Sequence, residues 1–431
     1  MFFLCLLLLL SYLGVLKFQT TQLLQQSRTQ VQGAATPDRL VSCYYNTPVP
    51  QDKHQLLPSN IHPHLCTHIN VAFAQIKNKS IHLEDHQYKT LKEVVSLKKL
   101  NPKLKILLSV GGASNDSGFP EMVAEHASRK VFIRSIKWIL RNHSLDGIDL
   151  DWEFPAVHDY ESTLNKRERQ HFSQLLREIR MEYIREKRNY LLSVAVAAPQ
   201  IIVDAAYDVD QINMYVDYVN IMTYDYHVFS EFTPFTGLNS PLYSRTAEHL
   251  YMATLNINYT VHMYMGKGLE RNKIVVGIPT YGHTFNLVNA NNGGVGSPAA
   301  GYGKVGSQGF VNFPDICKFI NTFKNDVKVY FDPDSLVPYL HRGHDWVSFD
   351  NPQSVMDKAK YITKNNLRGA MIYSLNADDH EGVCGLSGSK RGRRPGPTRG
   401  DTRRPGAARR GVRCDCRLSA AGAARLRCSA A

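Results

Sequence analysis

Three carboxylates alternate along a short run near the middle of this 431-residue chain. Residues 145–155 read Leu-Asp-Gly-Ile-Asp-Leu-Asp-Trp-Glu-Phe-Pro. Successive side chains of a strand point to opposite faces, so Asp149, Asp151 and Glu153 would share one face, about 6–7 Å apart. Like charges this close disfavour full ionisation, and at least one carboxyl should hold a proton near neutral pH. A buried carboxyl that keeps its proton can act as a general acid.

The elements that would position this run repeat along the chain. Eight short, apolar, β-branched runs predict strands at residues 40–45, 68–74, 105–111, 147–153, 191–198, 218–224, 273–279 and 369–375. Amphipathic stretches between them predict helices that include 88–100, 119–142, 166–187, 245–268 and 352–366. Eight strand–helix units predict an α/β fold, the (β/α)8 or TIM barrel, with the acidic run on its fourth strand.

One connection is much longer than the others. About ninety residues separate the seventh predicted strand from the eighth, and only the last part is needed for a helix. We expect residues from about 283 to 347 to form an inserted subdomain, with strand-like runs at 327–331 and 346–349. Because the insertion follows a strand, it should lie at the C-terminal face of the barrel, where active sites of this fold are found.

The basic charge of the chain is concentrated at its C-terminal end. The net charge is +13, but residues 386–431 hold 13 Lys and Arg against 2 acids, which leaves +2 for residues 1–385. We therefore expect no nucleic-acid partner. The tail is rich in Arg, Gly, Pro, Ala and Ser, which predicts disorder. It is either a functional polybasic tail or an altered ending; we favour the second, which predicts a missing eighth helix and an exposed apolar groove.

The N-terminal region and the cysteines bear on the compartment. Residues 1–16 are apolar and predict either a cleaved signal peptide or a signal anchor, followed by a flexible Gln- and Thr-rich stalk at 17–37 and the barrel domain at 38–385. Both alternatives deliver the domain to the lumen or the outside, and an anchor would attach it to a membrane. Four central cysteines suit two disulfides, with buried free thiols as the alternative. Four Asn-X-Ser/Thr sequons predict glycosylation at Asn78, Asn115, Asn142 and Asn258.

The acidic run resembles the active-site signature of glycoside hydrolase family 18, the chitinases and chitinase-like proteins. That signature, Asp-Gly-x-Asp-x-Asp-x-Glu, is matched by Asp146, Gly147, Asp149, Asp151 and Glu153. Further similar motifs occur in order at 109–112, 222–225, 279–282 and 369–371, and the resemblance extends from Arg39 to about Gly385. It implies a (β/α)8 barrel with an α+β insertion domain that walls a deep cleft for chitin or chito-oligosaccharides. It implies no cofactor and no metal, and we expect a monomer.

The resemblance also implies a role for each acid. The family is an exception to the two-carboxylate scheme of glycosidases, because the substrate's own 2-acetamido oxygen attacks the anomeric carbon. Glu153 would protonate the glycosidic oxygen, Asp151 would orient the acetamido group, and Asp149 would lie deeper and modulate Asp151. Tyr224 would donate its hydroxyl to the acetamido oxygen.

Positions that line the cleft follow by matching the family motifs. They are Tyr44, Phe73, Gly112, Phe154, Met222, Asp225, Tyr281, Met371 and Tyr373. For Phe73 and Met371, packing in the barrel core is an equally good interpretation. The resemblance also pairs the cysteines as Cys43 with Cys66 and Cys317 with Cys384.

Several positions depart from the family pattern. Active members carry Trp where Tyr373 stands and often have Trp at Ala113, Tyr at Phe154 and Arg at His283. Because Tyr offers less stacking area than Trp, and a glycan at Asn115 could crowd the cleft, binding of long chitin should be weakened while the acid relay is complete. The alternatives are a non-catalytic chitin-oligosaccharide-binding lectin, an enzyme acting on the chitobiose core of N-glycans, and a truncated product without function.

Overall fold

The computed structural model describes residues 39–49, 55–113, 118–157 and 165–385, with side chains from 167 onward in the last range. In the tail it describes only the backbone of β15 (Arg413–Leu418) and β16 (Ala424–Ser429), which pair antiparallel. The predicted signal segment and stalk, Asn115 and the rest of the tail lie outside the described residues, and the disordered tail stays a prediction. Within the described ranges, no helix has the length and apolar character needed to cross a membrane.

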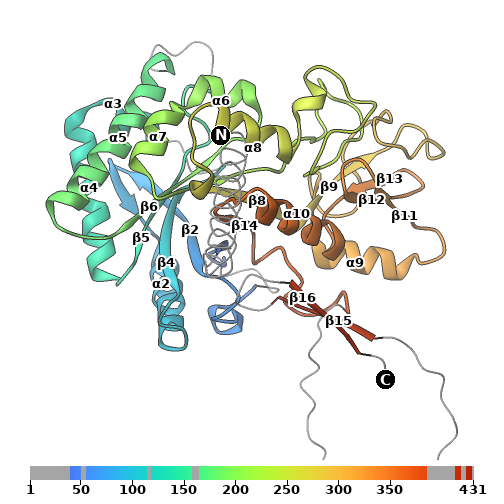
Figure 1. The fold of residues 1–431 in the computed structure, drawn as a ribbon, viewed down its shortest axis with the longest axis horizontal. Coiled ribbons are helices and arrows are strands. Elements are labelled where there is room, and N and C mark those ends of the chain that lie inside the picture. The colour runs from blue at the N-terminus through green and yellow to red at the C-terminus, as the bar shows by residue number, and fades with distance from the viewer. Residues whose placement is uncertain are drawn as a thin grey trace, which may run out of the picture. The chain divides into compact units, whose positions relative to one another are not determined.

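Eight parallel strands form the closed barrel that the sequence predicts (Figure 1). In chain order they are β1 (Leu40–Asn46), β2 (His68–Lys77), β4 (Lys105–Gly111), β5 (Gly147–Asp151), β6 (Leu191–Val196), β7 (Tyr218–Ile221), β8 (Ile274–Pro279) and β14 (Gly369–Tyr373). The barrel closes because β1 pairs with both β2 and β14. A short strand, β3 (Ser80–His82), pairs antiparallel with the end of β2.

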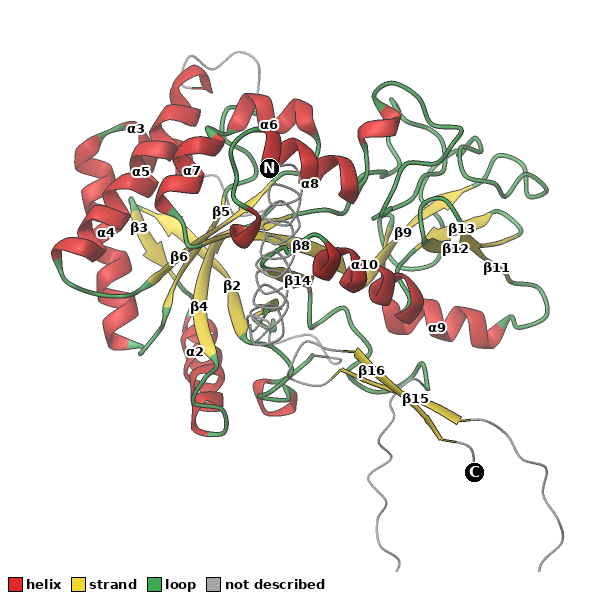
Figure 2. Ribbon diagram, viewed as in Figure 1, coloured by secondary structure: helices red, strands yellow, loops and turns green. Residues whose placement is uncertain are grey.

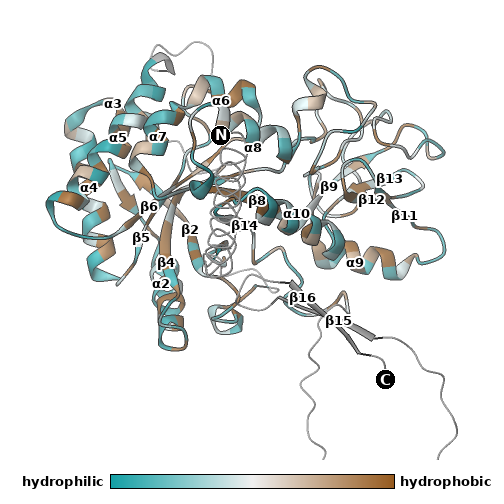
Figure 3. Ribbon diagram, in the orientation of Figure 1, coloured by the Kyte–Doolittle hydropathy of each residue, from teal (hydrophilic) through white to brown (hydrophobic). Residues whose placement is uncertain are grey.

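Helices lie on the outside of this barrel (Figure 2). They are α2 (Asp85–Ser96), α3 (Phe119–Ala124), α4 (His126–Asn142), α5 (Asn165–Arg185), α6 (Gln200–Ala206), α7 (Val209–Tyr215), α8 (Ile257–Gly266) and α10 (Pro352–Lys364). Figure 3 shows hydrophilic and hydrophobic residues interspersed along them, as expected for helices that bury only one face.

Two predicted helices differ from the structure. The helix expected over 119–142 is split into α3 and α4, because Glu125 between them has extended backbone angles (φ −122°, ψ 148°). The helix expected over 245–268 begins only at Ile257, where the Asn256 side chain caps it by accepting a hydrogen bond from the Tyr259 N–H. Most of the residues before this cap form turns, with one 3-10 turn at Met252–Thr254.

The strands bury two different faces. Outward-facing residues such as Ile148 and Leu150 join the helices in a large apolar layer, which also contains Phe132 and Leu175. Burial of each such side chain contributes about 1.5–3 kcal/mol to folding. The lumen of the barrel instead contains a separate aromatic and aliphatic cluster together with buried polar side chains. The polar side chains include Ser42, Asn70, Ser109, Asp149, Asp151, Ser193 and Asn220. The barrel interior is therefore a packed mixed layer on which a polar site can be built.

The long connection between β8 and β14 forms a second sheet, as predicted. Its antiparallel strands follow the order β10-β9-β13-β12-β11, with α9 (Phe313–Thr322) beside them (Figure 1). The strands are β9 (Tyr281–Asn286), β10 (Phe310–Asn312), β11 (Lys328–Asp332), β12 (Val337–Arg342) and β13 (Asp345–Ser348). Because only Thr280 separates the end of β8 from the start of β9, the insertion leaves the barrel at the C-terminal ends of its strands.

Two disulfides join distant parts of the described chain in the pairing that the family resemblance implies. Cys43 on β1 is bonded to Cys66, just before β2, and Cys317 on α9 is bonded to Cys384. Residues 374–385, which follow β14, form turns and bends. The expected loss of the eighth helix stays a prediction, because residues 386–412 lie outside the described part of the chain. The exposed apolar groove expected from that loss stays a prediction.

Candidate active site

The acidic run has the alternation that its sequence predicts. Asp149 and Asp151 on β5 are 0% and 2% exposed and face the lumen. Trp152 belongs to the outer apolar layer, where its ring stacks on Phe119 with centroids 5.1 Å apart. Glu153 follows the strand and is half-buried. The acids therefore rise from the barrel interior toward the C-terminal face, with Glu153 the most accessible of the three.

Asp149 is held by four hydrogen-bond donors from four other strands. The Tyr44 hydroxyl and the Ser109 hydroxyl donate to Oδ2, each at 2.7 Å. The Ser193 hydroxyl donates to Oδ1 at 2.6 Å, and the Asn220 amide donates to the same oxygen at 3.2 Å. The parallel register explains this arrangement, since β5 pairs Asp149 with Ser109 on one side and with Ser193 on the other.

These contacts have opposing effects on the Asp149 carboxyl. Burial raises the pKa of Asp149 above its usual value, and the four donors offset part of that increase. Three of the donors are hydroxyls, which can rotate to accept a hydrogen bond if the carboxyl gains a proton, whereas the NH2 group of Asn220 can only donate. Oδ2 faces two hydroxyls, so it is the oxygen on which a proton is best accommodated.

Two glycines let the end of β4 approach the acidic strand. Gly111 has φ +109°, and a Cβ there would lie 2.0 Å from the carbonyl oxygen of Asp151. Gly112 has φ +80°, its N–H donates to that same carbonyl at 2.8 Å, and a Cβ there would meet the Phe73 ring. The predicted cleft residue Gly112 thus fixes the backbone beside Asp151, a position that a residue with a side chain could not occupy.

Aromatic rings surround the lumen above the acids. The Tyr373 ring lies 5.6 Å from Tyr44 and 5.8 Å from Tyr224, measured between centroids. Tyr44 contacts Phe73 at 6.0 Å, and Tyr224 contacts Tyr281 edge-on at 5.9 Å. The four predicted cleft residues come from β1, β2, β14 and β9, and Tyr224, predicted as a catalytic residue, follows β7. The structure therefore brings them together around the C-terminal end of the lumen.

The Tyr224 hydroxyl lies deep in this group. Burial, with smaller contributions from Tyr373, Asp151, Asp225 and Glu153, raises the pKa of Tyr224 well above 10. The hydroxyl consequently keeps its proton and remains a donor at any ordinary pH. It contacts the Met371 sulfur at 3.8 Å, and Met371 is fully buried.

A second polar group lies at the border with the insertion. The Tyr281 hydroxyl donates to Asp225 Oδ1 at 2.6 Å, and His283 Nε2 lies 2.6 Å from the same oxygen. His283 Nδ1 lies 3.1 Å from the Gly309 carbonyl oxygen. Both ring nitrogens of His283 therefore lie against oxygen acceptors, one on Asp225 and one on the backbone of the insertion. His283 thus provides Asp225 with a donor where the family commonly has Arg.

The remaining predicted positions lie in different parts of the barrel. Phe73 and Met222 are half-buried and pack against the lumen cluster, whereas Phe154 packs against the outer apolar layer instead. Among the predicted glycosylation sites, Asn78 and Asn142 are exposed, and Asn258 is half-buried with its side-chain oxygen accepting from the Tyr361 hydroxyl at 3.1 Å. Glycosylation itself stays a prediction. Within the described ranges, no group of three or more His, Cys, Asp or Glu side chains could hold a metal ion.

The structure adds residues that the sequence reasoning did not assign. Ser193 and Asn220 hold Asp149, and the buried Tyr207 lies close enough to Asp151 and Glu153 that both raise its pKa further beyond the effect of burial. The sequence contains a signal for Ser193 and Asn220, since each is a lone polar residue at an inward position of an apolar strand. Which acid they contact depends on the pairing of the strands around the barrel.

The chain is similar to known proteins over most of its length. The family model described as glycosyl hydrolases family 18 matches residues 40–378. Human chitinase-3-like protein 2 is 36% identical over 354 residues, which cover 79% of this chain and 87% of that protein. The solved structure of Ostrinia furnacalis Group IV chitinase is 33% identical with a TM-score of 0.75 and covers 81% of this chain and 96% of that one. Human YKL-39, described as a pseudo-chitinase with retained chitooligosaccharide binding properties, is 33% identical with a TM-score of 0.74 and covers 80% and 95%.

Proposed function

Because the chain belongs to glycosyl hydrolase family 18 and is a chitinase or chitinase-like protein, we propose that it hydrolyses β-1,4 linkages between N-acetylglucosamine units. One observation carries the proposal: β5 places Asp149 and Asp151 in the lumen directly before the more accessible Glu153. Relatives with this fold include a chitinase and a pseudo-chitinase, so catalysis depends on these side chains and not on the fold alone.

The proposed reaction is substrate-assisted and retains configuration. Glu153 donates its proton to the glycosidic oxygen as the bond to the anomeric carbon breaks. The carbonyl oxygen of the substrate's 2-acetamido group forms a bond to that carbon and gives an oxazolinium ion. Water then attacks the same carbon, Glu153 accepts a proton from it, and the acetamido group is released with the original configuration restored. The protein supplies no nucleophile, and each step balances without a metal or cofactor.

The other residues would support the acetamido group. Asp151 would orient its N–H and stabilise the positive charge that develops on the ring. The raised pKa of Tyr224 keeps its hydroxyl protonated, which supports a role as donor to the acetamido oxygen. Asp149, with its raised pKa and its rotatable hydroxyl partners, is suited to exchange a proton with its surroundings as Asp151 changes charge.

Substrate choice would follow from the same arrangement. A reaction that needs the 2-acetamido group restricts the substrates to N-acetylglucosamine polymers, so chitin or chito-oligosaccharides are the proposed ligands. A sugar bound above the acids would rest near Tyr373, which offers a smaller stacking surface than Trp. We expect short oligomers to be cleaved more effectively, relative to long chitin, than by enzymes with Trp at this position.

The compartment belongs to the same proposal. The two disulfides favour an oxidising environment, and family 18 chitinases are typically secreted. We propose that the barrel acts in the lumen or outside the cell as a monomer, with glycans at the exposed Asn78 and Asn142. Whether residues 1–16 anchor the chain to a membrane depends on their cleavage.

A chito-oligosaccharide-binding lectin is the second candidate. It is favoured by the similarity to a pseudo-chitinase that retains binding, and by Tyr373 and Ala113 at positions where Trp is common. A fluorogenic chitotriose substrate separates the two candidates. Wild-type chain should turn it over, and Glu153→Gln should lower the rate on the order of 100- to 10,000-fold.

The control is Glu125→Gln, the same change at an exposed position outside the site. Calorimetric titration with chitotriose should show that Glu153→Gln still binds, since the substitution removes a proton donor and little volume. Equal turnover by wild type and Glu153→Gln would refute the hydrolase. Binding by wild type without any product would establish the lectin.

A further inference from the structure

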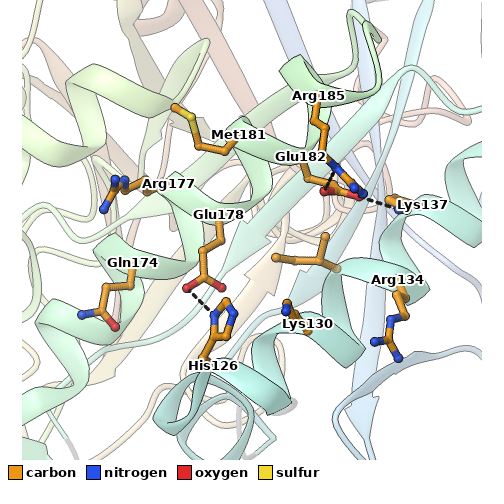
Figure 4. A pocket seen from close by; sticks show the side chains of 11 residues that line it. His126, Lys130, Arg134, Lys137, Gln174, Arg177, Glu178, Met181, Glu182 and Arg185 are labelled. Carbon is orange, nitrogen blue, oxygen red and sulfur yellow. Dashed lines mark hydrogen bonds and ion pairs between the residues drawn. The ribbon is translucent and has the colours of Figure 1, made fainter.

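A groove lies between α4 and α5 on the outer face of the barrel. Figure 4 shows charged side chains from both helices around it. Its volume is about 550 Å³, and its lining residues are His126, Lys130, Ile133, Arg134, Lys137, Gln174, Arg177, Glu178, Met181, Glu182 and Arg185. None of them belongs to the candidate active site. The groove is therefore a separate feature of the molecule.

Helical spacing places the basic residues in two facing rows. On α4, Lys130, Arg134 and Lys137 recur at intervals of four and three residues, which puts them on one side of the helix. On α5, Arg177 and Arg185 are eight residues apart, again close to a whole number of turns. The two rows line opposite walls, as Figure 4 shows.

The two acids of the groove are already paired. Glu178 accepts from Arg129 at 2.7 Å and lies 3.1 Å from His126. Glu182 pairs with Lys137 and Arg185, each at 2.5 Å. Both carboxylates are therefore neutralised by these neighbouring cations. Neither carboxylate forms an ion pair with the other basic residues of the groove.

Three cations of the groove have no such partner within the described part of the chain. Lys130, Arg134 and Arg177 are exposed and make no ion pair or side-chain hydrogen bond with any residue whose side chain is described. With His126 neutral, five cations and two acids give the lining a charge of +3. Residues 1–385 together carry only +2. The groove therefore carries a local excess of positive charge on a domain whose net charge is small.

We propose that this groove is a binding site for an extended anionic polysaccharide that carries sulfate or carboxylate groups. From residue 126 to residue 137 the α4 wall is about 16 Å long, at 1.5 Å per residue, so the groove suits a chain rather than a single ion. The Arg134 and Arg177 guanidinium groups can each donate two parallel hydrogen bonds to a sulfate or carboxylate. Ile133 and Met181 provide an apolar floor for the faces of sugar rings.

The shape of the groove favours a polysaccharide over a membrane. Ile133 is 7% exposed and the Lys137 side chain 18% exposed, so both lie in a recess that a flat lipid surface reaches poorly. A linear polymer can enter such a recess and contact both walls. The proposal does not depend on hydrolysis, because no lining residue takes part in the proposed reaction.

The test is binding of a heparin-derived oligosaccharide to the full chain, measured by calorimetry over a range of salt concentrations. The variant is Lys130→Gln/Arg134→Gln/Arg177→Gln, which keeps good helix formers and removes the three unpaired charges. The control is Lys89→Gln/Lys92→Gln/Lys99→Gln, which removes three exposed lysines without described ion pairs from α2 and the adjoining 3-10 turn. The basic tail is the same in all three proteins.

The groove variant should bind on the order of 10- to 100-fold more weakly than wild type at low salt, from three lost charge contacts. The slope of log K against log salt concentration should become shallower by roughly 2. The control variant should bind as wild type does, and all three proteins should turn over chitotriose equally. Equal losses in the two variants would mean that total charge alone, with the tail, determines binding, and would overturn the proposal.

Lysine acetylation maps the site directly. The oligosaccharide should protect Lys130 and Lys137 on the wild-type chain and leave Lys89 and Lys92 reactive. Protection confined to Lys390 in the tail would overturn the proposal. A second result would also overturn it. The groove variant would bind the heparin oligosaccharide as wild type does, but would lose binding to vesicles of anionic phospholipid or to a DNA duplex.

Discussion

The Tyr44 hydroxyl offers a sensitive probe of the Asp149 network. It donates to Asp149 Oδ2 at 2.7 Å, and the two residues are 1% and 0% exposed. The variant Tyr44→Phe removes one oxygen and keeps the ring. It leaves Asp149 with three donors and takes away an acceptor from Asn220, whose amide lies 3.3 Å from the hydroxyl. No water can replace the oxygen without a cavity to hold it.

The size of the effect depends on the charge of Asp149. A hydrogen bond to an ionised group contributes about 1.5–3 kcal/mol, and one between neutral groups about 0.5–1.5 kcal/mol. Burial already raises the pKa of Asp149, so its ionisation destabilises the folded state as pH rises through that pKa. Removing a donor raises the pKa further. The loss of unfolding free energy in Tyr44→Phe should therefore be larger at neutral pH than in acid, by about 1 kcal/mol.

Urea unfolding of wild type and Tyr44→Phe at about pH 4.5 and about pH 7.5 measures this difference. The matched control is Tyr45→Phe on the same strand. Its hydroxyl is equally buried but donates to the Leu56 carbonyl at 2.7 Å, a neutral acceptor. The control should lose about 0.5–1.5 kcal/mol at both pH values. The reasoning would be refuted if Tyr44→Phe and Tyr45→Phe lost the same unfolding free energy at both pH values.

Three further changes test other parts of the account. Cys317→Ser/Cys384→Ser opens a loop with a sequence separation of 67 and should lower the free energy of unfolding by about 4 kcal/mol, measured in urea. No loss would show that the disulfide does not constrain the unfolded chain. Lys358→Met leaves the buried Asp350 carboxylate without its ammonium partner at 2.6 Å and should lower the free energy of unfolding by about 3–5 kcal/mol in the same assay. The double variant Lys358→Met/Asp350→Asn should recover part of this loss. Gly111→Ala should abolish chitotriose turnover or prevent folding, because its Cβ would lie 2.0 Å from a carbonyl oxygen on β5; a folded, active variant would contradict the close approach.

The barrel could be predicted because its signals are local. Each strand is a short β-branched run, and the alternation of acids with Ile148 and Leu150 fixes which face is buried against the helices. Helix ends were less predictable. The stretch 245–268 has helical amphipathicity throughout, but the cap at Asn256 and the turns before it decide where α8 begins.

The environment of Asp149 could not be predicted, because its donors lie 40 to 105 residues away in sequence. Their inward positions follow from strand periodicity, but their contact with one carboxyl depends on the register around the closed barrel. The basic groove could not be predicted from the sequence for a different reason. Charged residues on the outer faces of α4 and α5 have an ordinary helical pattern, and only the pairing of Glu178 and Glu182 identifies which cations remain unpaired.

The stereochemistry of the first product tests the central claim most directly. When wild-type chain cleaves chitotriose, proton NMR at early times should show the new reducing end as the β anomer. The fully deacetylated trimer should give no product under the same conditions, because it lacks the acetamido oxygen that attacks the anomeric carbon. An initial α anomer, or equal cleavage of the deacetylated trimer, would contradict substrate-assisted hydrolysis by the Asp149, Asp151 and Glu153 site.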